Sequence, residues 1–304
     1  MTESSIVSAT RARIAEHLVG RERELELTLA AVAAGRDIVL EGPPGTSKTT
    51  MLHAITGEWG IPLLFVEGNA DLTPAKLVGH HNPARVLRED YSPDNFVAGP
   101  LTEAMQTGGF LYIEEFNRAP DDTLNTLLTA MADRRLAIPR VGTIEALPTF
   151  RVIASMNPYD NVGTTRLSTS ITDRLNRLAV DYQDSDAEEQ ITRLRAAPTG
   201  DLADRLVADA VALTRATRQH EYIRQGSSVR GAIDLVAVAT QLAELRELTQ
   251  PDDDRYPEMM LDAMYVTLSG RIHLDEAIDI SPEAVLREIW EDHFVLHPAL
   301  AEPG

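Results

Sequence analysis

The fold is decided by the stretch Gly42-Pro-Pro-Gly-Thr-Ser-Lys-Thr49. An apolar run at 37–41, which is typical of a β-strand, precedes it, and a run that can form a helix, 50–56, follows it. A glycine-rich loop that joins a strand to a helix and ends in Lys-Thr has the pattern of a phosphate-binding P-loop, G-x-x-x-x-G-K-[ST]. The glycines let backbone N–H groups wrap an anion, and the N-terminus of the helix adds partial positive charge. The stretch therefore predicts an α/β domain with a phosphate site.

Within the loop, Lys48 is placed to reach the β- and γ-phosphates of a nucleotide, and Thr49 to ligate Mg²⁺ through its hydroxyl. Ser47 replaces the last glycine of the pattern, at a cost of about 1 kcal/mol if that position needs a positive φ. An ordinary Gly/Pro turn is the alternative, and the strand before the loop and the Lys-Thr pair argue against it. ATP and Mg²⁺ are the expected cofactors, and the residues expected to bind the nucleotide are Gly42, Pro43, Pro44, Gly45, Thr46, Ser47, Lys48, Thr49 and Thr50.

Two carboxylates follow a second apolar strand, in Phe110-Leu-Tyr-Ile-Glu-Glu115. Ligands of doubly wound sheets bind at the carboxyl ends of the strands, which is where this pair falls. Glu114 is expected to hold the water shell of Mg²⁺, and Glu115 to orient and deprotonate the attacking water. The alternative is an exposed Glu-Glu pair without a role. A P-loop in the same chain favours the catalytic interpretation.

Strand-like and helical patterns alternate over the first part of the chain. Short apolar runs rich in β-branched or aromatic residues lie at 37–41, 63–67, 109–113, 150–154 and 178–180, with helical patterns such as 22–34 and 122–132 between them. This alternation predicts a parallel sheet that is covered on both faces. The connection 68–108 is too long for a plain loop, so we expect a short helix near 73–78 and an inserted element at about 80–97.

The strand pattern stops after Tyr182, and leucines then recur at helical spacing. The polar run Gln183-Asp-Ser-Asp186 is typical of a linker. We therefore expect two domains, an α/β domain at 1–183 and a smaller all-helical domain at 184–304.

Composition excludes several classes of protein. The 304 residues carry 28 Lys and Arg against 47 Asp and Glu, a net charge of −19, which argues against nucleic-acid or anionic-membrane binding over the whole surface. The chain has no cysteine, so disulfides and thiol chemistry are excluded. The N-terminus lacks the pattern of a signal peptide, and no run is long and apolar enough to cross a bilayer. We expect a cytoplasmic protein.

These residues together resemble the AAA+ ATPases and, within them, the MoxR family. The most specific segment is Ile113-Glu-Glu-Phe-Asn-Arg-Ala-Pro120 with the Leu/Met-rich helix after it, and Phe96-Val-Ala-Gly-Pro-Leu101 is similar to the segment that precedes the acidic strand in the family. The resemblance covers about residues 17 to 290. It implies a P-loop AAA+ core with a five-stranded parallel sheet, followed by a helical lid. Glu114 departs from the family, which usually has Asp there.

The resemblance also implies roles for residues outside the two motifs. Arg177 is the second choice for the arginine finger. Each of these assignments has a structural alternative, a strand-end turn for the asparagine and a surface cation for the arginines. The implied residues are Val19 and Gly20 beside the adenine, Asn157 as the first sensor of the γ-phosphate, Arg174 as the finger that enters the neighbouring subunit's site, and Arg230 as the second sensor.

For function, the resemblance implies an ATP hydrolase that assembles as a homo-oligomeric ring, expected to be a hexamer. Such a ring remodels, matures or activates a protein client, often with a separate von Willebrand factor A-domain protein. The related gas-vesicle and Rubisco-activating proteins share much of the pattern. Two alternatives stay open, a nucleic-acid-remodelling ATPase and a nucleotide-gated scaffold that hardly turns over.

Overall fold

A computed structural model describes residues 10–15, 18–89, 91–158 and 167–296. The first nine residues, on which part of the signal-peptide argument rests, lie outside this description. The chain divides into two compact units, one of Met1–Pro43 and Ser47–Asp181, the other of Tyr182–Gly304 with Pro44–Thr46. Over the described ranges, no helix combines the length and apolar character needed to span a membrane.

The first unit is built on a five-stranded sheet with the order β2-β5-β8-β1-β9. Every neighbouring pair in it is parallel. This confirms the expected sheet, and each strand lies within two residues of its predicted run. The strands are β1 (Ile38–Glu41), β2 (Leu63–Glu67), β5 (Phe110–Glu114), β8 (Arg151–Met156) and β9 (Asn176–Ala179).

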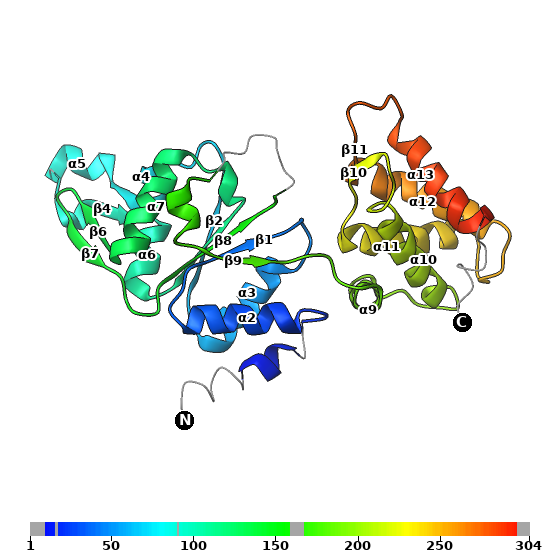
Figure 1. Ribbon diagram of the computed structural model, residues 1–304, viewed down its shortest axis with the longest axis horizontal. Helices are drawn as coiled ribbons and strands as arrows, with labels where there is room; N and C mark the ends of the chain where they lie inside the picture. Colours follow the sequence, from blue (N-terminus) through cyan, green and yellow to red (C-terminus); the bar gives the residue numbers. More distant parts are fainter. Residues whose placement is uncertain (1–9, 16–17, 90, 159–166, 297–304) are drawn as a thin grey trace. The chain divides into compact units, whose positions relative to one another are not determined.

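Helices cover both faces of this sheet (Figure 1). On one face lie α2 (Glu22–Ala33) and α3 (Lys48–Trp59), and on the other α6 (Pro100–Thr107) and α7 (Asp121–Asp133). Successive side chains of a strand point to opposite faces, so β5 serves both cores. Phe110 and Tyr112 join the core formed with α2 and α3, whereas Leu111 and Ile113 join the core formed with α6 and α7.

The long connection after β2 carries the expected short helix, α4 (Pro74–Val78). The hydroxyl of Thr73 begins this helix by accepting a hydrogen bond from the Lys76 N–H at 3.3 Å. The inserted element comes next, with β3 and β4 paired antiparallel. Its parts are β3 (Gly79–His81), α5 (Pro83–Glu89), the 3-10 turn η1 (Pro93–Asn95) and β4 (Phe96–Ala98).

The rest of the first unit connects these elements. A second antiparallel pair, β6 (Arg135–Ile138) and β7 (Gly142–Glu145), lies between α7 and β8 and was not predicted from the sequence. Two short helical turns flank strands of the sheet. The turn η2 (Phe116–Arg118) follows β5, and α8 (Thr169–Thr172) precedes β9.

The second unit packs its helices around a core that contains Leu235, Tyr256 and Met260. It also holds two short strands, β10 (Ile223–Gln225) and β11 (His273–Leu274), which pair antiparallel. The expectation of an all-helical unit is corrected in this detail, because strands this short leave no period-two pattern. The helices are α9 (Ser185–Ala196), α10 (Ala203–Ala216), α11 (Val229–Leu245), α12 (Tyr256–Leu268) and α13 (Pro282–Glu291), with the turns η3 (Ser269–Arg271) and η4 (Asp292–Leu296).

Candidate nucleotide-binding site

The carboxyl ends of β1, β8 and β5 bring three of the predicted segments to one edge of the sheet. The Gly42 N–H, just after β1, donates to the Met156 carbonyl at the end of β8 at 3.0 Å. A Cβ at Gly42 would lie 1.8 Å from the carbonyl oxygen of Val180, so a residue with a side chain does not fit there. The backbone segments after β8 and β9 therefore approach Gly42 closely and determine where the loop leaves the sheet.

The loop itself needs left-handed backbone at two positions. Gly45 has φ 74°. Ser47, directly before α3, has φ 64° and ψ 17°, so the position that usually holds glycine is one where a side chain is strained. For an L-residue this conformation costs about 1–2 kcal/mol. Ser47 therefore carries the strain that is expected when this position needs a positive φ.

Lys48 begins α3 and turns its ammonium back onto the loop. Its Nζ donates to the carbonyls of Gly42 at 3.0 Å and Pro43 at 2.7 Å. These contacts hold the charge beside the loop that is expected to wrap the phosphates. Thr50, the next helical position after Thr49, is exposed.

Thr49 and Glu114 meet between the start of α3 and the end of β5. The Thr49 hydroxyl donates to Glu114 Oε1 at 3.3 Å. It also lies 3.1 Å from the hydroxyl of Tyr112, which in turn lies 2.9 Å from that of Ser155. A hydroxyl and a carboxylate, both oxygen donors, form the ligand set that Mg²⁺ prefers, so the residues present fit this ion. Tyr112 and Ser155 belong to none of the motifs that predict the site from the sequence.

Glu115 lies just beyond the strand with φ 52°, a left-handed residue that turns the chain into η2. Its Oε2 is 3.2 Å from Nη1 of Arg118, and its side chain keeps 40% of its exposure. A Cβ at Gly68 would lie 2.4 Å from the Glu115 carbonyl oxygen, so the end of β2 packs tightly beneath this turn. Asn157 follows β8 and is half-buried at the same edge. Sequence reasoning missed the pairing of Arg118, which lies three residues from Glu115.

Val19 and Gly20 form a turn before α2, and Gly20 has φ 64°. The next residue, Arg21, is 3% exposed, and its Nη2 donates to the Asp181 carbonyl at 2.5 Å. Arg21 thus ties the turn to the end of β9. Arg21 is not among the residues predicted for the site from the sequence.

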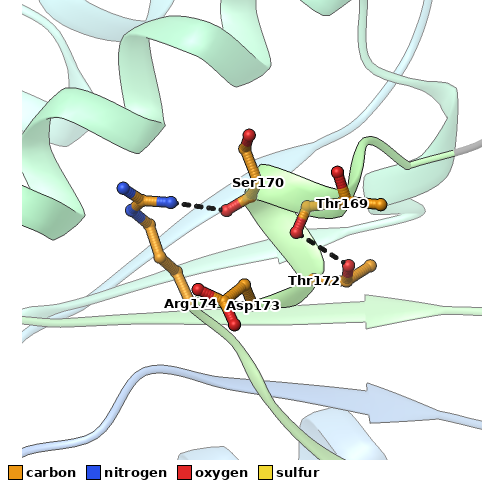
Figure 2. Close-up of a pocket in the computed structure, with 5 residues that line it drawn as sticks. All are labelled: Thr169, Ser170, Thr172, Asp173 and Arg174. Carbon is orange, nitrogen blue, oxygen red and sulfur yellow. Dashed lines mark hydrogen bonds between the residues drawn. The ribbon is translucent and has the colours of Figure 1, made fainter.

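The two candidate finger residues differ in what they contact. Arg174 is exposed and donates from Nη1 to the Ser170 carbonyl at 2.8 Å. It lies in an open depression that is lined by Thr169, Ser170, Thr172, Asp173 and Arg174 (Figure 2). Arg177 instead forms an ion pair with Glu41 at the end of β1, and this contact raises the pKa of its guanidinium. The third arginine, Arg230, belongs to the second unit, where it is exposed near the start of α11.

Residues 37–175 match the family model of the AAA domain, dynein-related subfamily. Over this segment the chain is similar to that domain. The match agrees with the resemblance to AAA+ ATPases drawn from the sequence, and it spans the loop, the acidic strand end, Asn157 and Arg174.

Similarity to known proteins extends beyond this segment. Gas vesicle ATPase GvpN of Ancylobacter aquaticus is 28% identical over 279 residues, with 84% of this chain and 75% of the relative covered. An uncharacterised protein of Staphylococcus epidermidis is 28% identical over 238 residues, with 75% and 89% covered. Among solved structures, the Holliday junction branch migration motor RuvB of Thermotoga maritima gives a TM-score of 0.52 at 17% identity, with 83% and 71% covered. That likeness concerns the fold alone.

Proposed function

We propose that the protein is a MoxR-like AAA+ ATPase that uses Mg²⁺-dependent ATP hydrolysis to remodel, mature or activate a protein client. The match to the AAA domain model and the similarity to a gas vesicle ATPase support ATP hydrolysis. The observation that carries the proposal is the meeting of Lys48, Thr49 and Glu114 at one edge of the sheet, with Glu115 beside them. The cation that binds the phosphates, the metal ligands and the general base then lie around one reaction centre.

Each residue of the site has a distinct task in this proposal. The loop residues, with Lys48, bind the phosphates, while Thr49 and Glu114 hold Mg²⁺ directly or through its waters. Glu115 orients and deprotonates the attacking water, and Asn157 hydrogen-bonds the water and the γ-phosphate. Val19 and Gly20 lie beside the adenine. Arg230 senses the γ-phosphate from a lid domain that we place at 184–304.

We further propose that the active form is a homo-oligomeric ring, a hexamer, in which Arg174 acts on the nucleotide of the neighbouring subunit. An exposed guanidinium that donates to a backbone carbonyl on its own turn can be redirected, whereas Arg177 is engaged with Glu41. Arginine suits this task because its planar charge spreads over the phosphate oxygens of the transition state. A separate von Willebrand factor A-domain protein is the proposed partner, and the cytoplasm the proposed location.

The test mixes two inactive variants, Arg174→Ala and Glu115→Gln. Their defects lie on different sides of a shared interface, so a mixed ring contains junctions with both groups intact, and ATPase activity should return. Arg177→Ala mixed with Glu115→Gln is the matched control and should show no such recovery beyond the activity of its own components. Mixtures that co-assemble by light scattering and stay inactive would count against Arg174 acting in trans. A fully active monomer would overturn the ring.

A nucleotide-gated scaffold is the second candidate, and the strained Ser47 favours it. A loop that stores backbone strain can bind ATP and turn it over slowly, and a steady-state ATPase assay separates the two candidates. The nucleic-acid-remodelling alternative has the charge of −19 against it. It predicts an ATPase rate that rises when DNA is added.

A further inference from the structure

Four side-chain oxygens form a continuous line beneath the P-loop. Ser155 Oγ lies 2.9 Å from Tyr112 Oη, which lies 3.1 Å from Thr49 Oγ1, which lies 3.3 Å from Glu114 Oε1. Tyr112 is 0% and Ser155 1% exposed, so the first half of the line is closed to solvent. The line runs from the core to the place where Mg²⁺ is proposed to bind.

The direction of these hydrogen bonds follows from the number of protons available. An ionised carboxylate only accepts, so the single proton of the Thr49 hydroxyl goes to Glu114. The Tyr112 hydroxyl also interacts with Glu114, but in its contact with Thr49 it must be the donor, and Ser155 then donates to Tyr112. Thr49 keeps one lone pair that no protein group uses along this line.

The strand geometry explains why these groups meet. Tyr112 and Glu114 are two residues apart on β5, so both point to the face covered by α3. Ser155 lies on the adjacent strand β8, and Thr49 is the second residue of α3. Two strands and one helix thus contribute to a single line of hydroxyls.

We propose that Tyr112 and Ser155 are positioning residues that fix the Thr49 hydroxyl with its free lone pair toward Mg²⁺. The proposal rests on the proposed function, because it presupposes that Thr49 ligates this ion. Donation from Thr49 to Glu114 makes the oxygen a better ligand, and donation from Tyr112 removes its freedom to rotate. Hydrogen bonds in such a chain also polarise one another in a buried setting.

A purely structural role makes a different prediction. If the line only satisfied buried hydroxyls, its loss would lower stability and leave Mg²⁺ binding alone. The positioning role predicts that the affinity for nucleotide without Mg²⁺ is kept, whereas the gain from adding Mg²⁺ is lost. Loss of an outer partner of a metal ligand typically reduces metal affinity by roughly 10–100-fold.

The experiment measures Kd by calorimetry for the non-hydrolysable ATP analogue AMP-PNP, with Mg²⁺ and with EDTA, on the full-length protein. Tyr112→Phe should reduce the Mg²⁺-dependent gain in affinity by roughly 10-fold, with the EDTA value within about twofold of wild type. Ser155→Ala should reduce it less, and the double variant should match Tyr112→Phe, because Ser155 acts through Tyr112. Tyr256→Phe is the matched control, since it also removes a buried tyrosine hydroxyl, one that donates to Asp209 at 2.9 Å in the second unit. It should leave the gain unchanged.

Three outcomes overturn the inference. Tyr112→Phe and Ser155→Ala with the wild-type gain would show that the line does not act on Mg²⁺. Equal losses of AMP-PNP affinity with Mg²⁺ and with EDTA would show that the hydroxyls support the shape of the loop and not the metal ligand. A wild-type protein that binds the analogue without any gain from Mg²⁺ would overturn both this inference and the proposed function, and only that outcome touches the latter.

Discussion

At the amino end of the central sheet Asp37 is 5% exposed, whereas at the carboxyl end the side chain of Glu115 is 40% exposed. Asp37 accepts from Arg134 Nη2 at 2.8 Å and from the Val152 N–H at 2.7 Å. Glu115 has Arg118 at 3.2 Å on a turn with φ 52°. One carboxylate is enclosed by its partners, and the other faces the solvent from which a ligand would come.

A carboxylate is thus a buried structural group at one end of the strands and an accessible candidate base at the other. Burial raises the pKa of the Asp37 carboxyl in spite of the opposing hydrogen bond from Val152 and the charge of Arg134. Such a group needs every partner it has, because an unpaired buried charge is costly. A base at the carboxyl end must instead stay accessible to water.

The largest effect is expected at the carboxyl end, from Glu115→Gln. The amide keeps the shape of the side chain but cannot accept the proton of the attacking water, so the steady-state ATPase rate should fall by roughly 10²–10⁴-fold. ATP binding should persist. Glu67→Gln is the control, because Glu67 ends β2 in register with Glu114 and is exposed. If Glu114→Gln stops turnover and Glu115→Gln does not, the two carboxylates have been assigned in reverse.

The next effect is expected at the amino end, from Asp37→Ala. Removing this carboxylate leaves Arg134 and the Val152 N–H without their acceptor, so the free energy of unfolding should fall by about 3–5 kcal/mol in urea denaturation. Asp37→Asn should cost less, because its carbonyl oxygen can still accept from Val152. Nucleotide affinity of the folded protein should not change. Loss of ATP binding with unchanged stability would break the comparison between the two ends.

Asp37 also predicts a pH dependence of stability. Its folded-state pKa is raised above the usual 3.8, so between the two values the folded protein binds more protons than the unfolded chain. The free energy of unfolding should therefore fall as pH rises through this window, and the Asp37→Asn variant should lack this contribution. Urea denaturation of both proteins from pH 4 upward measures the difference. A difference that grows in favour of wild type with rising pH would contradict the sign.

A smaller effect is expected from Ser47→Gly in the loop. Glycine adopts φ 64° without the strain of a side chain but loses more entropy on folding, so the net gain in stability should be about 0.5–1 kcal/mol. Ala54→Gly in the middle of α3 should have the opposite sign, a loss of about 1 kcal/mol. Thermal unfolding compares the two variants. A loss of stability in Ser47→Gly would show that the serine side chain contributes something beyond strain.

Local patterns in the sequence were enough to predict the sheet, the loop and the acidic strand end. The P-loop spacing identified Lys48 and Thr49 as candidate phosphate and Mg²⁺ ligands. The alternation of side chains along a strand could also have placed Tyr112 on the same face as Glu114. The pairing of Asp37 with Arg134 could not be predicted, because it joins residues far apart in the chain. The positive φ of Ser47 depends on the packing of the loop, and β10 and β11 are too short to leave a pattern. The residues assigned by resemblance alone, such as Arg174, stay predictions.

The most direct test of the central claim, that the carboxyl edge of the sheet binds Mg²⁺–ATP through Lys48, is calorimetry on wild type and Lys48→Ala. The variant removes the ammonium that the loop holds beside the phosphates, so it should show no measurable ATP binding while wild type binds. The chain has one other lysine, the exposed Lys76, and Lys76→Ala should bind ATP as wild type does. Wild-type affinity in a folded Lys48→Ala variant would contradict the account.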